Sequence, residues 1–240
     1  MDVLIFEGMK VGVVDGDFTV CVDEHGKMDS KLILSTSYNV LPLWLRIAYE
    51  NIVLSHQASK AIAKSWCKDT EKQKALLLSE LTPSIQVFVA CGIALDALYE
   101  QLKPFANISQ GDIEAWKRKK TSRAAQIAEV VRRVYKLDNP TSKAFKHNIE
   151  SIMEFRDQAV HPSHKIKRTC TRPDIHVGVD WRFSAYRYSN SAVCYRRTME
   201  MFIHLFEKGS NEEKVNENMK NIFKALKELK LVTEKNLGKI

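Results

Sequence analysis

The feature that most constrains this chain is helical periodicity, which runs from Leu41 almost to the last residues. Apolar residues recur there every three or four positions, as they do on the buried face of a helix. Thr82 and Pro83 are expected to begin one helix and Asn139-Pro140 another, because these residue types favour helix starts. We expect helices at about 41–67, 70–80, 83–102, 111–137, 141–160 and 190–208, and a last amphipathic helix within NIFKALKELKLV.

Two stretches depart from this period. The N-terminal segments VLIFE and KVGVVDGDFTVCVDEHG predict two or three short strands, with Asp15-Gly16 and His25-Gly26 as turns. Between residues 161 and 189 the alternation in DIHVGVDWRFSAYRY predicts a β-hairpin or ribbon. The sequence therefore predicts a mainly all-α domain over 1–240, with an N-terminal β-hairpin and a β-ribbon insertion. Its parts are a β-rich extension (1–38), a helical core (40–208) and a C-terminal helix (209–240).

Composition favours a soluble, globular protein in the cytoplasm. Hydrophobic residues make up 45% of the 240 positions and charged residues 28%. The five cysteines are odd in number and never form Cys-x-x-Cys, which favours a reducing compartment over a disulfide scaffold or a zinc ribbon. The most apolar stretch, 85–95, is too short to span a bilayer and runs into Asp96. We expect no membrane partner and no cofactor.

Positive charge is concentrated in two regions of the chain, whose net charge is +8. Eight basic residues lie between Trp116 and Lys136 against one acid, and nine lie between Arg156 and Arg197 against three. Such clusters predict a polyanionic partner, whose counterions would be released on binding. The alternative interpretation is that they are solvated faces of helices.

The segment IMEFRDQAVHPSHK, residues 152–165, places an arginine in a buried stripe. Arg156 follows Ile149 and Ile152 at helical spacing, so it must meet an acid, a carbonyl or an anionic ligand. Pro162 disfavours helical backbone at the residue before it, so the helix should end near Val160 and let His161 turn back towards Arg156. A permanent cation beside a group that titrates near neutrality suits phosphate chemistry.

Arg156-Asp157-Gln158-Ala159-Val160-His161, followed by a proline, resembles the Arg-x(4–6)-His signature of HEPN-domain ribonucleases. The resemblance spans roughly 40–208 and implies an antiparallel helical bundle. It implies metal-independent RNA cleavage through attack of the ribose 2′-hydroxyl, which leaves a 2′,3′-cyclic phosphate and a 5′-hydroxyl. It also implies a homodimer whose two motifs face one cleft, and a role in phage defence or as a toxin.

The resemblance and the charge pattern together nominate the site residues. Arg156 and His161 would be catalytic, Asp157 would orient one of them, and Asp96 on an earlier helix would line the cleft. Ser163 stands where one subgroup carries a modifiable tyrosine, and this departure argues against the toxin–antitoxin pairing of that subgroup; any regulatory or antitoxin partner is unknown. The residues expected to bind RNA are Lys117, Arg118, Lys119, Lys120, Arg123, His164, Lys165, Arg182 and Arg187.

Several alternatives stay open. The Arg–His spacing is also met by Arg197 and His204, which lie inside an unbroken predicted helix and could be a simple surface pair. The aromatic and basic ribbon Trp181–Tyr188 could stack on unpaired bases, or could be an ordinary strand. No phosphate-binding loop, dinucleotide fingerprint or nucleophile elbow occurs. A non-catalytic HEPN-like module that binds RNA or protein is the main competing function. A metal site could be formed by His161, His164, Cys170 and His176.

Overall fold

The structure, a computed structural model, describes residues 2–6, 8–161 and 168–232. It is mostly helical, which confirms the mainly all-α prediction. The helices are α1 Leu41–Ser65, α2 Thr70–Leu102, α3 Gln110–Lys119, α4 Arg123–Tyr135, α5 Asn139–Val160, α6 Trp181–Ala185, α7 Tyr188–Lys208 and α8 Glu213–Glu228. The strands are β1 Asp2–Phe6, β2 Met9–Gly12, β3 Phe18–Val22, β4 Met28–Leu32, β5 Ser35–Tyr38, β6 Cys170–Arg172 and β7 Val177–Val179.

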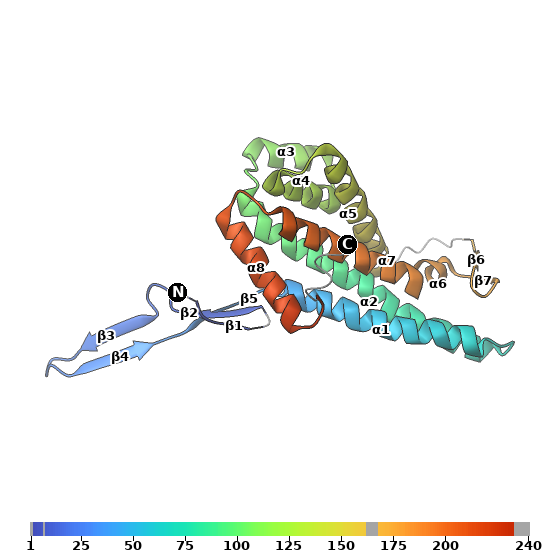
Figure 1. The fold of residues 1–240 in the computed structure, drawn as a ribbon, viewed down its shortest axis with the longest axis horizontal. Helices are drawn as coiled ribbons and strands as arrows, with labels where there is room; N and C mark the ends of the chain where they lie inside the picture. Colours follow the sequence, from blue (N-terminus) through green and yellow to red (C-terminus); the bar gives the residue numbers. More distant parts are fainter. Residues whose placement is uncertain (1, 7, 162–167, 233–240) are drawn as a thin grey trace.

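Helix α2 forms the centre of the helical body, and α1, α4, α5 and α7 all pack against it (Figure 1). Its buried face includes Val87, Cys91, Leu95 and Leu98, which belong to one continuous hydrophobic core. Helix α8 closes one end of the body, where Phe223 stacks on Phe206 with ring centroids 4.1 Å apart. The core therefore positions α2 and α5 side by side, so that side chains of the two helices can meet.

The sequence predicts two helices where the structure has one, because α2 continues through Pro83. A proline inside a helix loses one backbone hydrogen bond and usually destabilises it by about 3 kcal/mol. Here Pro83 is buried, and its neighbour Ser84 makes a buried hydrogen bond of 2.6 Å to Ser55 of α1. Packing along α1 outweighs the local cost, and the helix begins instead at Thr70, where the Asp69 carboxylate caps it.

Over 111–137 the sequence predicts one helix, whereas the structure has two, α3 and α4. Lys120 adopts the left-handed conformation (φ 50°, ψ 44°) and ends α3. The Ser122 side chain then accepts a hydrogen bond from the backbone of Ala125 and begins α4. Local capping chemistry outweighs the continuous apolar period, so the chain turns back between these helices. Helix α5 begins at Asn139, two residues before the prediction, because the Asp138 carboxylate caps it.

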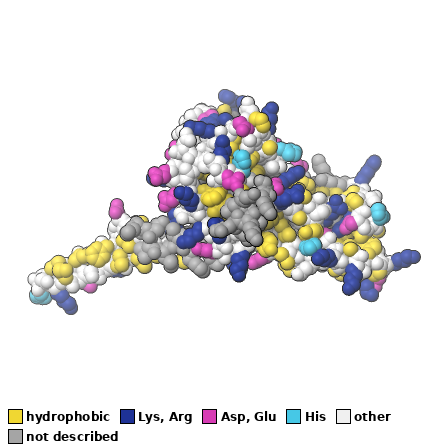
Figure 2. All heavy atoms as spheres, viewed as in Figure 1, with side chains coloured by type: hydrophobic (Ala, Val, Ile, Leu, Met, Phe, Trp, Pro, Cys, Tyr) yellow, Lys and Arg dark blue, Asp and Glu magenta, His cyan; other side chains and the backbone are white. Residues whose placement is uncertain are grey.

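The described residues of the N-terminal region form five strands rather than a single hairpin. Strands β1, β2 and β5 form one antiparallel sheet, and β3 and β4 form a separate hairpin that projects from the body (Figure 1). The predicted turns at Asp15-Gly16 and His25-Gly26 are confirmed, and both glycines have positive φ. Asp17 joins the two parts through hydrogen bonds to Val14 and Ser35. Hydrophobic side chains lie along the projecting hairpin, among them Phe18, Val22 and Met28 (Figure 2).

The predicted ribbon between α5 and α7 is only partly correct. Strands β6 and β7 do pair antiparallel, but Trp181–Ala185 is helical because the Asp180 carboxylate caps its first turn. Arg172 of β6 is 1% exposed and forms an ion pair with Glu80 of α2, at 2.6 Å. This buried pair fastens the hairpin to the helical body.

By length and composition, one described helix could span a bilayer. It runs over residues 70–105, and 56% of its most apolar window is buried within the body.

Candidate active site

The end of α5 has the geometry that the sequence predicts. The helix stops at Val160, and His161 leaves helical backbone with φ −119° and ψ 73°. Its backbone N–H still donates to the carbonyl of Asp157, at 2.8 Å. Pro162, the residue expected to cause this break, lies outside the described residues. His161 is exposed at the point where the helix ends.

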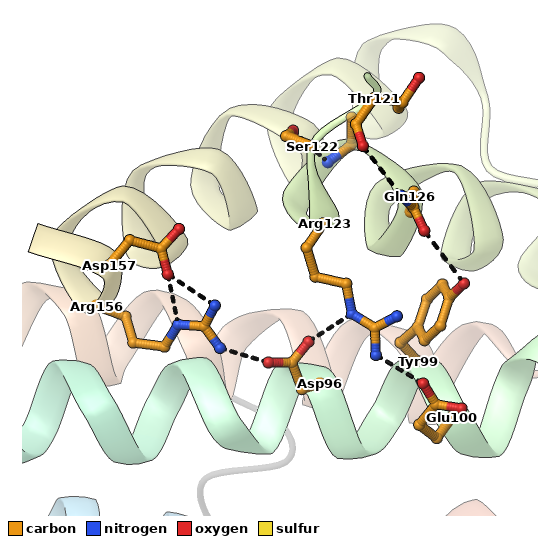
Figure 3. A network of polar contacts seen from close by, with 10 residues as sticks. Asp96, Tyr99, Glu100, Thr121, Ser122, Arg123, Gln126, Arg156 and Asp157 are labelled. Carbon is orange, nitrogen blue, oxygen red and sulfur yellow. Dashed lines mark hydrogen bonds and ion pairs between the residues drawn. The ribbon is translucent and has the colours of Figure 1, made fainter. Parts of the chain in front are cut away.

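Arg156 meets two carboxylates, one on its own helix and one on α2 (Figure 3). Its Nη1 donates to Asp96 at 2.5 Å, while Nε and Nη2 donate to one Asp157 oxygen at 2.9 and 2.7 Å. The side chain is 20% exposed. These contacts use three of the five N–H donors of the guanidinium. The buried-stripe arginine therefore has the acidic partner that its position requires.

Gly92 allows Arg156 to lie flat across α2. A methyl group at Gly92 would stand 2.6 Å from Cδ of Arg156, 3.1 Å from Cγ and 3.2 Å from Cβ. Real carbon atoms do not approach so closely, so any larger residue would push the arginine and α5 away from α2. The close approach of the two helices is thus coupled to the position of the guanidinium.

Asp96 bridges two arginines. Its other oxygen accepts from Nε of Arg123 at 2.7 Å, and Arg123 also donates to Glu100 at 2.7 Å (Figure 3). The Arg123 guanidinium lies over the ring of Tyr99, 3.8 Å from its centroid. Burial lowers the pKa of Arg123, but the hydrogen bonds to Asp96 and Glu100 outweigh it and raise that pKa above its usual range. The result is an ion-pair chain that joins α2, α4 and α5.

An open groove of about 530 Å³, here called the α5 groove, lies beside this chain. Among the described residues, Arg156 makes its side-chain hydrogen bonds to Asp96 and Asp157 and none to His161. One arginine faces three carboxylates in the groove, so its described lining carries a net negative charge. The lining residues are Ser122, Arg123, Ala124, Glu150, Met153, Glu154, Asp157, Gln158 and His161.

The predicted RNA-binding residues fall into three groups. Lys117, Arg118, Lys119 and Lys120 are exposed at the end of α3, and Arg123 begins α4 inside the ion-pair chain. Arg182 pairs with Asp180, Arg187 flanks the start of α7, and no contact of the described residues links either arginine to Asp96. His164 and Lys165 lie outside the described residues.

Two aromatic residues of 181–188 pack against the helical body. Tyr186 is 1% exposed, packs against Phe88 and Phe155, and donates its hydroxyl to the carbonyl of Phe155 at 2.7 Å. Tyr188 stacks on His56 of α1, with ring centroids 4.5 Å apart. Tyr186 and Tyr188 therefore join this segment to the helical body, and the helix Trp181–Ala185 corrects the strand interpretation. Trp181 and Phe183 are half-buried, and stacking of this segment on unpaired bases stays a prediction.

Sequence reasoning missed three contributors to this network: Gly92, Glu100 and Arg123 as a partner of Asp96. Gly92 and Asp96 lie four residues apart, on one face of α2. Glu100 extends that face by a further turn. A glycine followed by two acids at helical spacing is a signal that a cation from another helix could dock there. Its specific partners depend on the break between α3 and α4, which the apolar period conceals.

Among the described residues, no group of three or more His, Cys, Asp or Glu side chains is arranged to hold a metal ion. Of the four residues of the alternative metal site, His164 lies outside the described residues.

Comparison with known proteins gave no relatives. No family model, no curated protein and no solved structure matches the chain.

Proposed function

We propose that the chain is a metal-independent endoribonuclease, in which His161 transfers protons and Arg156 binds phosphate. The observation that carries this proposal is the exposure of His161 on the wall of the α5 groove, one helical turn beyond a guanidinium with two N–H donors unused by the described residues. The resemblance of this segment to the HEPN signature supports the same chemistry. RNA, and a second copy of the chain facing the first, are the partners that this function needs.

In the proposed reaction, His161 accepts the proton of a ribose 2′-hydroxyl while that oxygen attacks the adjacent phosphorus. The bond from phosphorus to the 5′ oxygen of the next nucleotide breaks, that oxygen takes a proton from water, and His161 then returns its proton to the solvent. The products are a 2′,3′-cyclic phosphate and a 5′-hydroxyl. Arg156 would stabilise the negative charge that builds on the phosphate oxygens, and this step requires no metal ion.

Substrate binding would have to rearrange the carboxylates around Arg156. Asp157 is 53% exposed, whereas Asp96 is 25% exposed and is held by Arg123 as well. Asp157 is therefore the carboxylate that a phosphate displaces more easily. In this proposal Asp96 keeps the guanidinium in place, and Asp157 holds it only until RNA binds.

The test is to incubate the purified protein with total RNA in excess EDTA, alongside His161→Ala and Arg156→Ala. Cleavage that survives EDTA, leaves cyclic phosphate ends and disappears in both variants would support the proposal. The control variants are His147→Ala, an exposed histidine on the same helix, and Arg196→Ala, an exposed arginine on α7; both should cleave normally. Circular dichroism of each variant separates loss of activity from loss of folding. Cleavage that requires a metal would contradict the proposal, and a one-subunit mass in gel filtration would count against a shared cleft.

A second candidate, a non-catalytic helical module that binds RNA or protein, is favoured by the charges at the site. Arg156 is held by two carboxylates, and the described lining of the α5 groove is acidic. In that case Arg156 is part of the fold rather than of a reaction. Tight RNA binding with no new ends, unchanged in His161→Ala, would select this candidate.

A further inference from the structure

A separate hollow of about 240 Å³ lies between α5 and α7 and reaches Phe88 of α2; we call it the Arg197 hollow. Its apolar lining is formed by Phe88, Ile152, Phe155, Val193 and Cys194, and its polar lining by Asn148, Ser151, Asn190 and Arg197. Neither Arg156 nor His161 lines it, so it is distinct from the α5 groove.

Arg197 is half-buried on the wall of this hollow, and no carboxylate of the described residues pairs with it. Its neighbour Arg196, which points elsewhere, does pair, with Glu200 at 3.6 Å. Asn148 and Ser151 are also half-buried and make no side-chain hydrogen bond within the described residues. Polar groups that converge on an apolar hollow without protein partners are typical of ligand recognition.

The charges of the lining define the ligand further. Arg197 is the one charged side chain among the described residues of the hollow. A neighbouring hollow of about 390 Å³ shares Asn148 and Arg197 but is also lined by Glu200, Glu207 and His204. A ligand anion would pair with Arg197 at the junction, while the two carboxylates beyond it would repel a second negative group. The ligand should therefore carry one anionic group.

The floor of the hollow indicates a flat apolar body. The rings of Phe88 and Phe155 lie 5.1 Å apart at an angle of 36°. Phe88 is buried, so the half-buried Phe155 supplies most of the aromatic surface that a ligand ring could contact. The hollow is smaller than the roughly 300–1,000 Å³ of pockets for drug-sized molecules, so it suits a single ring or a fused pair.

We propose that the Arg197 hollow binds a small planar apolar molecule with one carboxylate or phosphate group, with the ring against Phe155 and the anion on Arg197. Asn148 and Ser151 would donate further hydrogen bonds to the anion or to a ring substituent. This site does not depend on the proposed ribonuclease activity, because the two share no residue.

The test is to titrate the full-length protein with benzoate and with phenyl phosphate, each followed by protein-detected NMR. Benzyl alcohol, which has the ring without the charge, is the comparison ligand. We expect at least one anion to bind with a Kd on the order of 1 mM or tighter, and benzyl alcohol at least about tenfold more weakly. The stronger of the two anions tells whether the natural ligand is a carboxylate or a phosphate.

Three variants locate the binding. Arg197→Gln should weaken anion binding at least about tenfold, whereas Arg196→Gln, its matched control, should leave it unchanged. Val193→Phe should abolish binding by filling the hollow while Arg197 stays in place. If neither anion binds, or if both bind Arg197→Gln as tightly as the parent protein, the proposal is wrong. Arg197→Gln is decisive even if Val193→Phe does not fold, because it changes only a partly exposed side chain.

Discussion

Arg156 and Arg197 stand in similar sequence contexts and in different physical situations. Each projects from a long helix and precedes a histidine, His161 in one case and His204 in the other. Arg156 lies against Gly92 and is held by carboxylates from α2 and α5, whereas no described carboxylate pairs with Arg197 at its hollow. An arginine that pairs with carboxylates of the same chain contributes to stability. An arginine without such a partner can pair with an anionic group of a ligand. The difference arises from other helices, so Arg–His spacing alone does not reveal it.

The substitution Gly92→Ala should have the largest effect, and it tests whether Arg156 is held in the fold by close packing against α2. Replacing glycine by alanine inside a helix normally stabilises by about 0.5–1 kcal/mol. Here the methyl group would collide with Arg156, so we expect a loss of about 2–3 kcal/mol in the free energy of unfolding. The control is Gly111→Ala in α3, where the nearest side-chain atom would be 3.7 Å away. Denaturant unfolding measures both, and a stabilised Gly92→Ala would contradict the close packing of Arg156.

Removing the shared carboxylate should have the next largest effect. Asp96→Ala leaves Arg123 without one of its partners and Arg156 with Asp157 alone. Since Asp96 is largely but not fully buried, we expect a loss of about 2 kcal/mol. Glu100→Ala, which removes an exposed partner of Arg123 only, should cost less than about 0.5 kcal/mol. Equal losses in chemical denaturation would show that Asp96 does not couple the three helices.

The two arginines can also be compared directly, by Arg156→Gln and Arg197→Gln. Arg156→Gln should cost about 1 kcal/mol, because Asp96 keeps Arg123 as a counter-charge. Arg197→Gln should change the free energy of unfolding by less than about 0.5 kcal/mol. Thermal unfolding of the pair gives the ranking, and a larger loss for Arg197→Gln would reverse the assignment of roles.

A third arginine, Arg133, is also held by carboxylates, and its pair with Asp112 should make stability depend on pH. We expect this effect on stability to be the smallest of those considered. Hydrogen bonds from Arg133, and then from Ser109, lower the pKa of Asp112, which caps α3. Because the folded-state pKa lies below the unfolded value of about 3.9, the stabilisation is complete at neutral pH and is lost as the pH falls below about 4. The Tm difference between the parent and Asp112→Asn should therefore shrink between pH 7 and pH 3. A difference that stays constant with pH would rule out this linkage.

Much of the fold could be predicted because apolar period and capping residues act locally. The end of α5 at Val160 and the need of Arg156 for a partner both follow from local rules. The predicted helix start at Pro83 was wrong because burial against α1 outweighs the local cost of a proline within a helix. The predicted single helix over 111–137 was wrong because the left-handed conformation of Lys120 ends α3, although the apolar period continues.

The partners of the site residues were harder to predict, since they come from distant parts of the chain. Asp96 meets Arg123 and Arg156, 27 and 60 residues away. Glu80, an acid within the apolar face of α2, meets Arg172 of the later hairpin. Periodicity shows that each acid requires a cation, but several cations in the chain would satisfy the requirement equally well.

The two acids of α2 have a consequence for the order of assembly. Glu80 and Asp96 lie sixteen residues apart on one continuous helix, a distance of about 24 Å along its axis. Both pair with arginines that are synthesised later, Asp96 with Arg123 and Arg156 and Glu80 with Arg172. During synthesis the α1–α2 hairpin can form from neighbouring segments before any of these arginines emerges. We therefore expect α2 to act as the template on which α4, α5 and then the β6–β7 hairpin pack in turn, each supplying an arginine to an acid of α2.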